Sequence, residues 1–253
     1  MSEGQERALS FGSVAEDYEA TRPGWPVEPF ALAFEQFGLP DRPDVVDVAA
    51  GTGKLTRTLA EIAGTLVAVE PDPVLRAVLQ RQLPGVIALD GTAEELPLET
   101  ASADAACAGQ AFHWFDLDLA LDEFARVLRP RGIAIAAWNS PPEAGTWYDA
   151  VIEFLTTANP AHLPATTMDW SAALAVHPQF GGLLEIAVRH EQPTDRATFR
   201  RQLGTHSAIN ALEPGRRQEL IDQALEVAEA QGAFDGGNGA IPWRCELFVL
   251  RRA

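Results

Sequence analysis

The sequence predicts an α/β fold, in which a doubly wound, mostly parallel sheet of seven strands carries helices on both faces and a helical cap. From Asp44 to Trp138, short apolar runs alternate with amphipathic stretches. This order of strands and helices implies right-handed crossovers between parallel strands. The apolar runs are almost uninterrupted, which is typical of strands that are covered on both faces.

Five strands are predicted within this stretch, at Asp44–Ala49, Thr65–Val69, Gly85–Leu89, Ala103–Cys107 and Ile133–Trp138. Cap and breaker residues place three helices between them: Lys54–Ala63, a helix from the N-cap Asp72 to about Gln82, and a helix from the N-cap Asp116 that Pro130 and Gly132 stop.

The flanking sequence predicts further helices at Val14–Ala20, Pro26–Phe37, Thr146–Thr157, Asp169–Val176, Arg196–Leu212 and Glu213–Gln231, and strands at Leu183–His190 and Trp243–Leu250. No linker separates these pieces from the central stretch. We therefore expect one domain over residues 1–253, with segments at about 141–182 and 192–240 forming a cap over the carboxyl edge of the sheet.

Composition excludes several classes of partner. The chain of 253 residues has 19 basic and 36 acidic residues, a net charge of −17, so phosphate backbones and anionic membranes repel it. We expect no nucleic-acid or membrane partner, and the sequence gives no oligomeric state. The N-terminus lacks an apolar signal core, and no apolar run approaches the roughly 20 residues of a membrane span, so a cytoplasmic protein is expected.

The cysteines and the spacing of possible metal ligands exclude two further features. Two cysteines, Cys107 and Cys245, are too few for a disulfide framework or a zinc site made of several thiolates, and both stand in apolar runs. We expect buried free thiols there. No His, Cys and acid cluster has convincing metal spacing, so no metal site is predicted.

The strongest local signal is VVDVAAGTGKL, from Val45 to Leu55, where an apolar strand leads into a turn of small residues and then a helix. Gly51 and Gly53 permit unusual dihedrals and let a ligand approach the amides at the start of the helix. Glu70 ends the second strand, where a carboxylate can bind a ribose diol. Two simpler interpretations stay open: a tight turn without a ligand, and a solvated acid at a strand end.

Together, the loop and the acid indicate a ligand that contains adenosine. From Gly51 the sequence reads G-T-G-K-L-T, so Thr56 stands where a dinucleotide fingerprint has its third glycine. A phosphate-binding P-loop is also absent from the sequence. The spacing therefore argues against NAD, FAD and nucleoside triphosphates.

With these motifs, the chain resembles the class I S-adenosylmethionine-dependent methyltransferases. VVDVAAGTGKL is similar to their first motif, D-x-G-x-G-x-G, with Ala49 in place of the first glycine. VAVEP (Val67–Pro71) is similar to their second motif, with Glu70 as the acid that binds the ribose. Further resemblances, to the small-molecule (type 11) subgroup related to ubiquinone-pathway and trans-aconitate methyltransferases, lie in FGSVAEDYEATRPGW (Phe11–Trp25), ALDGTAEELPL (Ala88–Leu98), AGQAFHWFD (Ala108–Asp116), FARVLRPRG (Phe124–Gly132) and LGTHSAINAL (Leu203–Leu212).

The resemblance implies a Rossmann-like fold and S-adenosyl-L-methionine as the cofactor. It also implies the cofactor-binding residues Tyr18, Arg22, Ala49, Ala50, Gly51, Gly53, Glu70, Pro71, Gly91, Thr92, Ala93, Glu94 and Gln110. In that assignment Arg22 clamps the cofactor's carboxylate, and Thr92 bonds the edge of the adenine. The alternatives are that Arg22 is a surface charge and that Glu94 is a first-turn acid of a short helix.

The candidate catalytic residue is His113, which follows the fourth predicted strand at the edge where ligands bind. It would serve either as a general base or as part of the pocket's shape. The candidate substrate-binding residues are Trp25, Trp114, His206, Ser207 and Asn210. For the tryptophans the alternative is plain packing, and for the last three it is a polar helix surface.

The function expected from this resemblance is transfer of a methyl group from S-adenosyl-L-methionine to a small-molecule acceptor by in-line displacement. Two alternatives remain open: an S-adenosylmethionine-dependent cyclase or lyase on the same fold, and a non-catalytic protein that binds an adenosine ligand. The sequence identifies neither the acceptor nor the atom that receives the methyl group.

Overall fold

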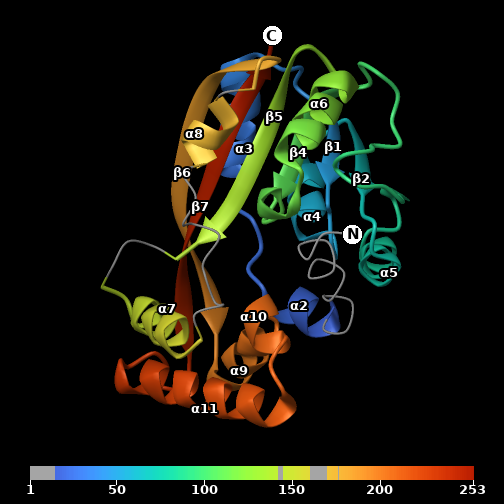
Figure 1. The fold of residues 1–253 in the computed structure, drawn as a ribbon. Helices are drawn as coiled ribbons and strands as arrows, with labels where there is room; N and C mark the ends of the chain where they lie inside the picture. The colour runs from blue at the N-terminus through green and yellow to red at the C-terminus, as the bar shows by residue number, and fades with distance from the viewer. Residues whose placement is uncertain (1–14, 142–144, 160–169, 176) are drawn as a thin grey trace. The chain divides into compact units, whose positions relative to one another are not determined.

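The computed structural model describes residues 15–141, 145–159, 170–175 and 177–253 (Figure 1). The chain forms two compact units. The sheet unit comprises Gly24–Asn139, Met168–Val188 and Cys245–Ala253, and the helical unit comprises Met1–Pro23, Ser140–Thr167 and Arg189–Arg244. The expectation of a single domain with a cap over the sheet edge stays a prediction.

Seven strands form one sheet in the order β3-β2-β1-β4-β5-β7-β6. Their bounds are β1 Asp44–Val48, β2 Thr65–Val69, β3 Ile87–Leu89, β4 Ala103–Gly109, β5 Leu128–Ser140, β6 Phe180–Thr194 and β7 Gly239–Arg252. β1 pairs in parallel with both β2 and β4, so the chain order reverses between β1 and β4. The crevice outside their carboxyl ends is the topological switch point, where sheets of this type bind ligands. The predicted fold class is confirmed.

The helices of the sheet unit begin and end at the predicted signals. Their bounds are α3 Glu28–Phe37, α4 Lys54–Ile62, α5 Pro73–Gln82, η2 Phe112–Trp114, α6 Leu117–Val127 and α8 Trp170–Ala175. The Asp72 carboxylate accepts the N–H groups of Val74 and Leu75 at the start of α5. Asp116 caps α6 in the same way, and Gly38, in the left-handed region, ends α3. These caps satisfy amides and carbonyls that the first and last helical turns leave open.

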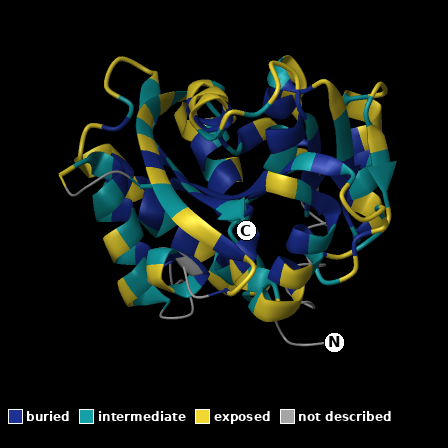
Figure 2. Cartoon of the chain, turned by 90° about the horizontal axis from the view of Figure 1, so that it is seen from above, coloured by how far each residue is buried: buried dark blue, intermediate teal, exposed yellow. Residues whose placement is uncertain are grey.

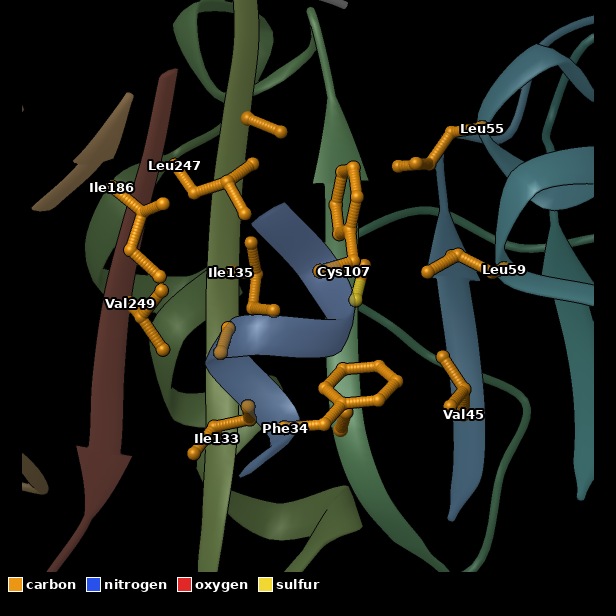
Figure 3. Packing of buried hydrophobic residues seen from close by; sticks show 14 of the residues in the cluster. Phe34, Val45, Leu55, Leu59, Cys107, Ile133, Ile135, Ile186, Leu247 and Val249 are labelled. Atoms are coloured by element: carbon orange, nitrogen blue, oxygen red, sulfur yellow. The ribbon is translucent and has the colours of Figure 1, made fainter. Parts of the chain in front are cut away.

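One face of the sheet is buried under α3 and α4. Phe34 of α3 and Leu59 of α4 pack against Val45, Cys107 and Ile135 of the central strands (Figure 3). On the other face, Phe124 of α6 lies edge-on to Phe112, with ring centroids 5.5 Å apart. Because both faces are covered, β1 and β4 are almost wholly buried (Figure 2). This explains their continuous apolar runs.

The helical unit has a core of its own. Its helices are α2 Ala15–Thr21, α7 Trp147–Ala158, α9 Arg196–Gly204, α10 Ser207–Asn210 and α11 Pro214–Ala230. Tyr148, Phe199, Leu220 and Trp243 are among the buried residues of that core. A capping box between Thr146 and Asp149 begins α7. None of the helices in the described part of the chain is both long and apolar enough to span a bilayer.

Two predicted boundaries are wrong. The predicted helix Arg196–Leu212 is broken, because α9 ends at Gly204 and Thr205 donates its hydroxyl to the carbonyl of Gln202. His206, Ser207 and Asn210 therefore do not share one face of a continuous helix. The second wrong boundary is the end of α6. This helix ends at Val127, before Pro130, and β5 begins directly at Leu128. Pairing of Leu128 with Ala103 of β4 holds this residue in extended conformation.

Smaller differences concern the ends of strands. Ala49 leaves β1 for a turn, β3 begins at Ile87 and β4 continues to Gly109. Val14, Asp169 and Val176, which end predicted helices, lie outside the described residues. Cys107 and Cys245 are free thiols and fully buried, as predicted.

Arg129 joins the amino-terminal ends of three strands, since its guanidinium lies 2.8 Å from Asp44 Oδ2 and 2.8 Å from Asp104 Oδ1. We expect Arg129→Met to lower the free energy of unfolding by about 1 kcal/mol, because partly exposed ion pairs contribute about 0–1 kcal/mol each. Urea unfolding at low and high salt measures this, and salt should shrink the difference. Arg131→Met is the control, since Arg131 is exposed two residues further along β5. An equal loss in both variants contradicts the prediction.

Candidate functional site

Strained backbone marks the carboxyl ends of β1 and β4. Ala49 directly follows β1 with φ 55°, and Gln110 directly follows β4 with φ 58°. The left-handed region costs a residue with a Cβ roughly 1–2 kcal/mol. Two such residues at neighbouring ends of parallel strands indicate a functional site at the switch point.

The glycine loop runs from Ala49 to the start of α4. Gly51 and Gly53 have φ of 59° and 90°, and Gly53 N donates to the carbonyl of Ala50 at 2.9 Å. A Cβ on Gly53 would lie 3.0 Å from Leu79 Cγ, whereas a Cβ on Gly51 would meet nothing within 4 Å. Gly53 therefore serves close packing, while Gly51 has open space beside it.

Glu70, just beyond β2, ties this loop down. Its Oε2 accepts the N–H of Gly51 at 2.8 Å, and its Oε1 accepts the N–H of Asp72 at 2.8 Å. The residue is only 5% exposed, so the alternative of a solvated acid at a strand end is wrong. Burial raises the pKa of Glu70 to about 7, although the two amides oppose the rise.

A second buried acid, Asp47, lies on β1. Its Oδ2 accepts the hydroxyl of Thr56 at 2.6 Å, whereas Oδ1 has no hydrogen-bond partner among the described residues. Burial raises the pKa of Asp47 to about 7, and the neighbouring charge of Glu70 adds to this rise. Asp47 is not among the site residues predicted from the sequence. An acid inside an apolar strand was the available signal, because buried charges are rare without a partner.

The predicted adenine-binding segment follows β3. Thr92 and Glu95 form an isolated antiparallel bridge, and Ala93 between them is buried. A Cβ on Gly91 would lie 2.6 Å from Pro97 Cδ, so this glycine permits a close approach within the segment. No helix begins here, and the alternative for Glu94 as a first-turn acid is therefore wrong.

Glu94 has a different role. Its Oε1 accepts the N–H of Asp116, the N-cap of α6, at 3.0 Å. This bond joins the segment to the start of α6.

Gln110 and Asn139 connect the ends of β4 and β5. Gln110 Nε2 donates to the carbonyl of Asn139 at 2.6 Å, and Asn139 Nδ2 donates to the carbonyl of Gly24 at 3.1 Å. Trp25 follows Gly24, and a Cβ on Gly109 would lie 2.7 Å from Trp25 Cζ2. Trp25 thus covers the end of β4 by close packing.

His113 lies in the short helix η2, beside Trp114 at a centroid distance of 4.5 Å. Loss of hydration lowers the pKa of His113 to about 4. The residue is exposed to solvent, so its ring keeps part of its hydration. An imidazole with a lowered pKa is neutral at pH 7 and can accept a proton, although it is a weaker base than free histidine.

Five predicted site residues belong to the helical unit: Tyr18, Arg22, His206, Ser207 and Asn210. Arg22 Nε donates to Thr205 Oγ1 at 2.8 Å, and its guanidinium lies 5.5 Å from the ring centroid of Tyr18. His206 lies in the break between α9 and α10, and the carbonyl of Asn210 accepts from Arg217. Among the described residues, no group of three His, Cys, Asp or Glu side chains could hold a metal ion.

Comparison with known proteins agrees with this geometry. Residues 46–136 match a family model described as a methyltransferase domain. An uncharacterized methyltransferase of Mycobacterium tuberculosis is 43% identical over 143 residues, which cover 56% of this chain and 57% of that protein. A proposed type II methyltransferase from Anaeromyxobacter dehalogenans has a TM-score of 0.68 at 27% identity, over 91% of this chain and 96% of that chain. Over residues 46–136 the chain therefore matches a methyltransferase domain.

The match to the mycobacterial relative spans little more than half of that protein's length. A methyltransferase from Haemonchus contortus, solved with S-adenosylhomocysteine, shares the fold with a TM-score of 0.55 at 14% identity, over 95% of this chain and 57% of that one. Ala49, which stands where the motif D-x-G-x-G-x-G has its first glycine, has φ 55°. A glycine adopts this conformation without steric cost, whereas the alanine here is strained.

The two raised carboxyl pKa values predict a pH dependence of stability. Glu70 rises from 4.5 and Asp47 from 3.8, each to about 7, so the folded state binds these protons more tightly than the unfolded state. The contribution of these two groups to the free energy of unfolding is therefore largest below about pH 4, and it is lost as the pH rises to about 7. We expect Asp47→Asn to remove about 1–4 kcal/mol of this loss.

Urea unfolding between about pH 5 and 8 measures this effect, because the variant lacks the titrating carboxyl group at residue 47. Asp104→Asn, at the opposite edge of the sheet, is the control. An identical pH slope in wild type and Asp47→Asn contradicts the prediction.

Proposed function

We propose that this chain transfers a methyl group from S-adenosyl-L-methionine to a small-molecule acceptor by in-line displacement. The observation that carries the proposal is the pairing of Gly51 with Glu70. A loop with open space beside it and a buried carboxylate beyond β2 meet across a hydrogen bond of 2.8 Å at the switch point. Ligands of such sheets bind at this position.

The residues present fit an adenosine-containing cofactor. Each carboxylate oxygen of Glu70 accepts one backbone N–H, and an oxygen of this kind has a second lone pair for a ribose hydroxyl. Thr92 and Ala93 would lie against the purine edge, and the backbone at Ala49 and Gly51 would face the methionyl part. The bound cofactor supplies a methyl group activated by its sulfonium. The chain's own task is to hold the acceptor in line and to exclude water.

A small acceptor suits the charge of the chain. The net charge of −17 disfavours long polyanions such as nucleic acids as acceptors. In our proposal His113 accepts the proton that an oxygen or nitrogen acceptor loses. Its lowered pKa keeps the ring unprotonated at neutral pH. General base catalysis of this kind contributes about 10²–10⁴-fold to the rate.

Isothermal titration calorimetry tests the cofactor. We expect binding of S-adenosylhomocysteine. We expect no binding of NADH, because Thr56 stands where the dinucleotide-binding motif has its third glycine. Glu70→Ala should weaken that binding roughly 10–150-fold, because a hydrogen bond to a charged group is worth about 1.5–3 kcal/mol. The variant should also unfold more easily, since it leaves the amides of Gly51 and Asp72 without their acceptor. Glu61→Ala on the exposed side of α4 is the control, and an unchanged affinity in Glu70→Ala would refute the assignment.

Product analysis separates methyl transfer from the alternatives. Incubation with S-adenosylmethionine and a panel of small acceptors should release S-adenosylhomocysteine. Methylthioadenosine as the product would instead indicate attack on the aminobutyrate arm, as in a cyclase or lyase. Tight cofactor binding without any turnover over the whole panel would favour a binding protein.

The role of His113 predicts a particular pH profile. With an acceptor from that panel, we expect His113→Gln to lower kcat about 10²–10⁴-fold while the Kd for S-adenosylhomocysteine changes little. In the wild type, the plot of kcat against pH should show a rise with its midpoint well below the free histidine pKa of about 6.5. This rise should be absent in the variant. His190→Gln is the control, because burial also lowers the pKa of His190, on β6, and the proposed function gives this histidine no role. Full turnover with an unchanged profile in His113→Gln would show that the residue is only part of the pocket's shape.

A further inference from the structure

The segment from Thr92 to Leu98 has almost no regular structure of its own. Apart from the bridge between Thr92 and Glu95, it forms neither a helix nor a strand. In the proposed function this segment must present fixed donors and acceptors to a purine. Its position therefore has to come from contacts with another element.

Side chains in the last turns of α6 provide these contacts. Glu123 Oε2 accepts the N–H of Leu96 at 2.8 Å. Arg126 donates to the carbonyl of Leu96 at 2.9 Å through Nη2, and to the carbonyl of Leu98 at 2.7 Å through Nη1. Three backbone groups of one irregular segment are thus bound by two side chains of one helix.

Glu123 and Arg126 also bind one another. Arg126 Nε lies 2.5 Å from Glu123 Oε1, and Nη2 lies 2.7 Å from Oε2, in a two-pronged pair. This bond lowers the pKa of Glu123 and keeps the carboxylate charged. A bidentate pair fixes direction as well as distance. The two side chains therefore hold their backbone partners in one geometry.

The same segment is attached to α6 near its other end. Glu94 Oε1 accepts the N–H of Asp116, at the start of the helix. Asp116 and Arg126 are ten residues apart on α6, which is about 15 Å along a helix. Ala93 lies next to the first attachment, and Leu96 and Leu98 belong to the second. The stretch that would face the purine is held from both sides.

We propose that the Glu123–Arg126 pair is a positioning device that gives the cofactor site its selectivity for adenine, an inference that rests on the proposed function. Adenine offers an amino donor and a ring-nitrogen acceptor on its edge, and hypoxanthine offers the reverse pattern. Backbone groups held in place reject the reversed pattern, because a mismatch leaves polar groups unpaired. A segment free to move accommodates both bases and binds adenine less well.

The test compares the affinities of S-adenosylhomocysteine and S-inosylhomocysteine, in which hypoxanthine replaces adenine, by calorimetry. Wild type should bind the adenine compound more tightly. Arg126→Met keeps the apolar stem and removes the donors. It should weaken the adenine compound about tenfold and the inosine compound about twofold at most, so the ratio of the two Kd values falls at least about fivefold.

Two further variants sharpen the test. Arg216→Met is the matched control, because Arg216 and Glu219 form a pair of the same spacing, at 2.8 Å, on α11 of the helical unit. It should leave both affinities unchanged. Arg126→Lys keeps the charge without the fork and should give an intermediate ratio. It also replaces Arg126→Met if that variant does not fold.

The possible failures can be told apart. If wild type binds S-adenosylhomocysteine and the ratio of Kd values is unchanged in both Arg126 variants, the pair is only a brace for the fold and the inference is overturned. A lower unfolding midpoint with an unchanged ratio has the same meaning. If wild type binds neither compound, the proposed function is wrong, and the inference is wrong with it.

Discussion

The buried carboxylate of Glu70 is the contact on which the site depends. It accepts one amide from the glycine loop and one from Asp72, and Asp72 in turn caps α5. Arg76 of α5 donates back to the carbonyl of Glu70. The loop after β1, the end of β2 and the first turn of α5 are thus joined through one side chain. The two backbone amides offset part of the hydration that this acid loses at 5% exposure, and burial still raises its pKa to about 7.

Several features of the site oppose folding. Asp47 and Glu70 are buried acids with raised pKa values, and Ala49 and Gln110 hold a conformation that costs a side-chain-bearing residue free energy. These features gather at the carboxyl edge of the central strands. At the amino edge, by contrast, Arg129 bridges Asp44 and Asp104 favourably. The sheet therefore combines a strained edge that is shaped for binding with an opposite edge that is electrostatically satisfied.

The fold was largely predictable because its signals are local. Asp72 and Asp116 begin helices as their N-cap chemistry requires, and the apolar runs of β1 and β2 are read directly from the sequence. The break before His206 was not predictable, since the helical pattern continues through it and a tertiary hydrogen bond from Arg22 to Thr205 accompanies the end of α9. The same limit applied to Glu94, which has its partner 22 residues further along the chain. The role of Arg126 was not predictable for a similar reason, because this side chain binds backbone carbonyls that no sequence pattern identifies.

The two buried cysteines give the sheet unit a built-in reporter. Cys107 on β4 and Cys245 on β7 are fully enclosed in one apolar cluster, and the chain contains no other thiol. Burial also raises the pKa of both thiols, so the reactive thiolate is suppressed as long as the strands stay closed. A thiol reagent consequently labels only molecules in which this part of the sheet has opened. The labelling rate measures the free energy of that opening in the unaltered protein, separately from any opening of the helical unit.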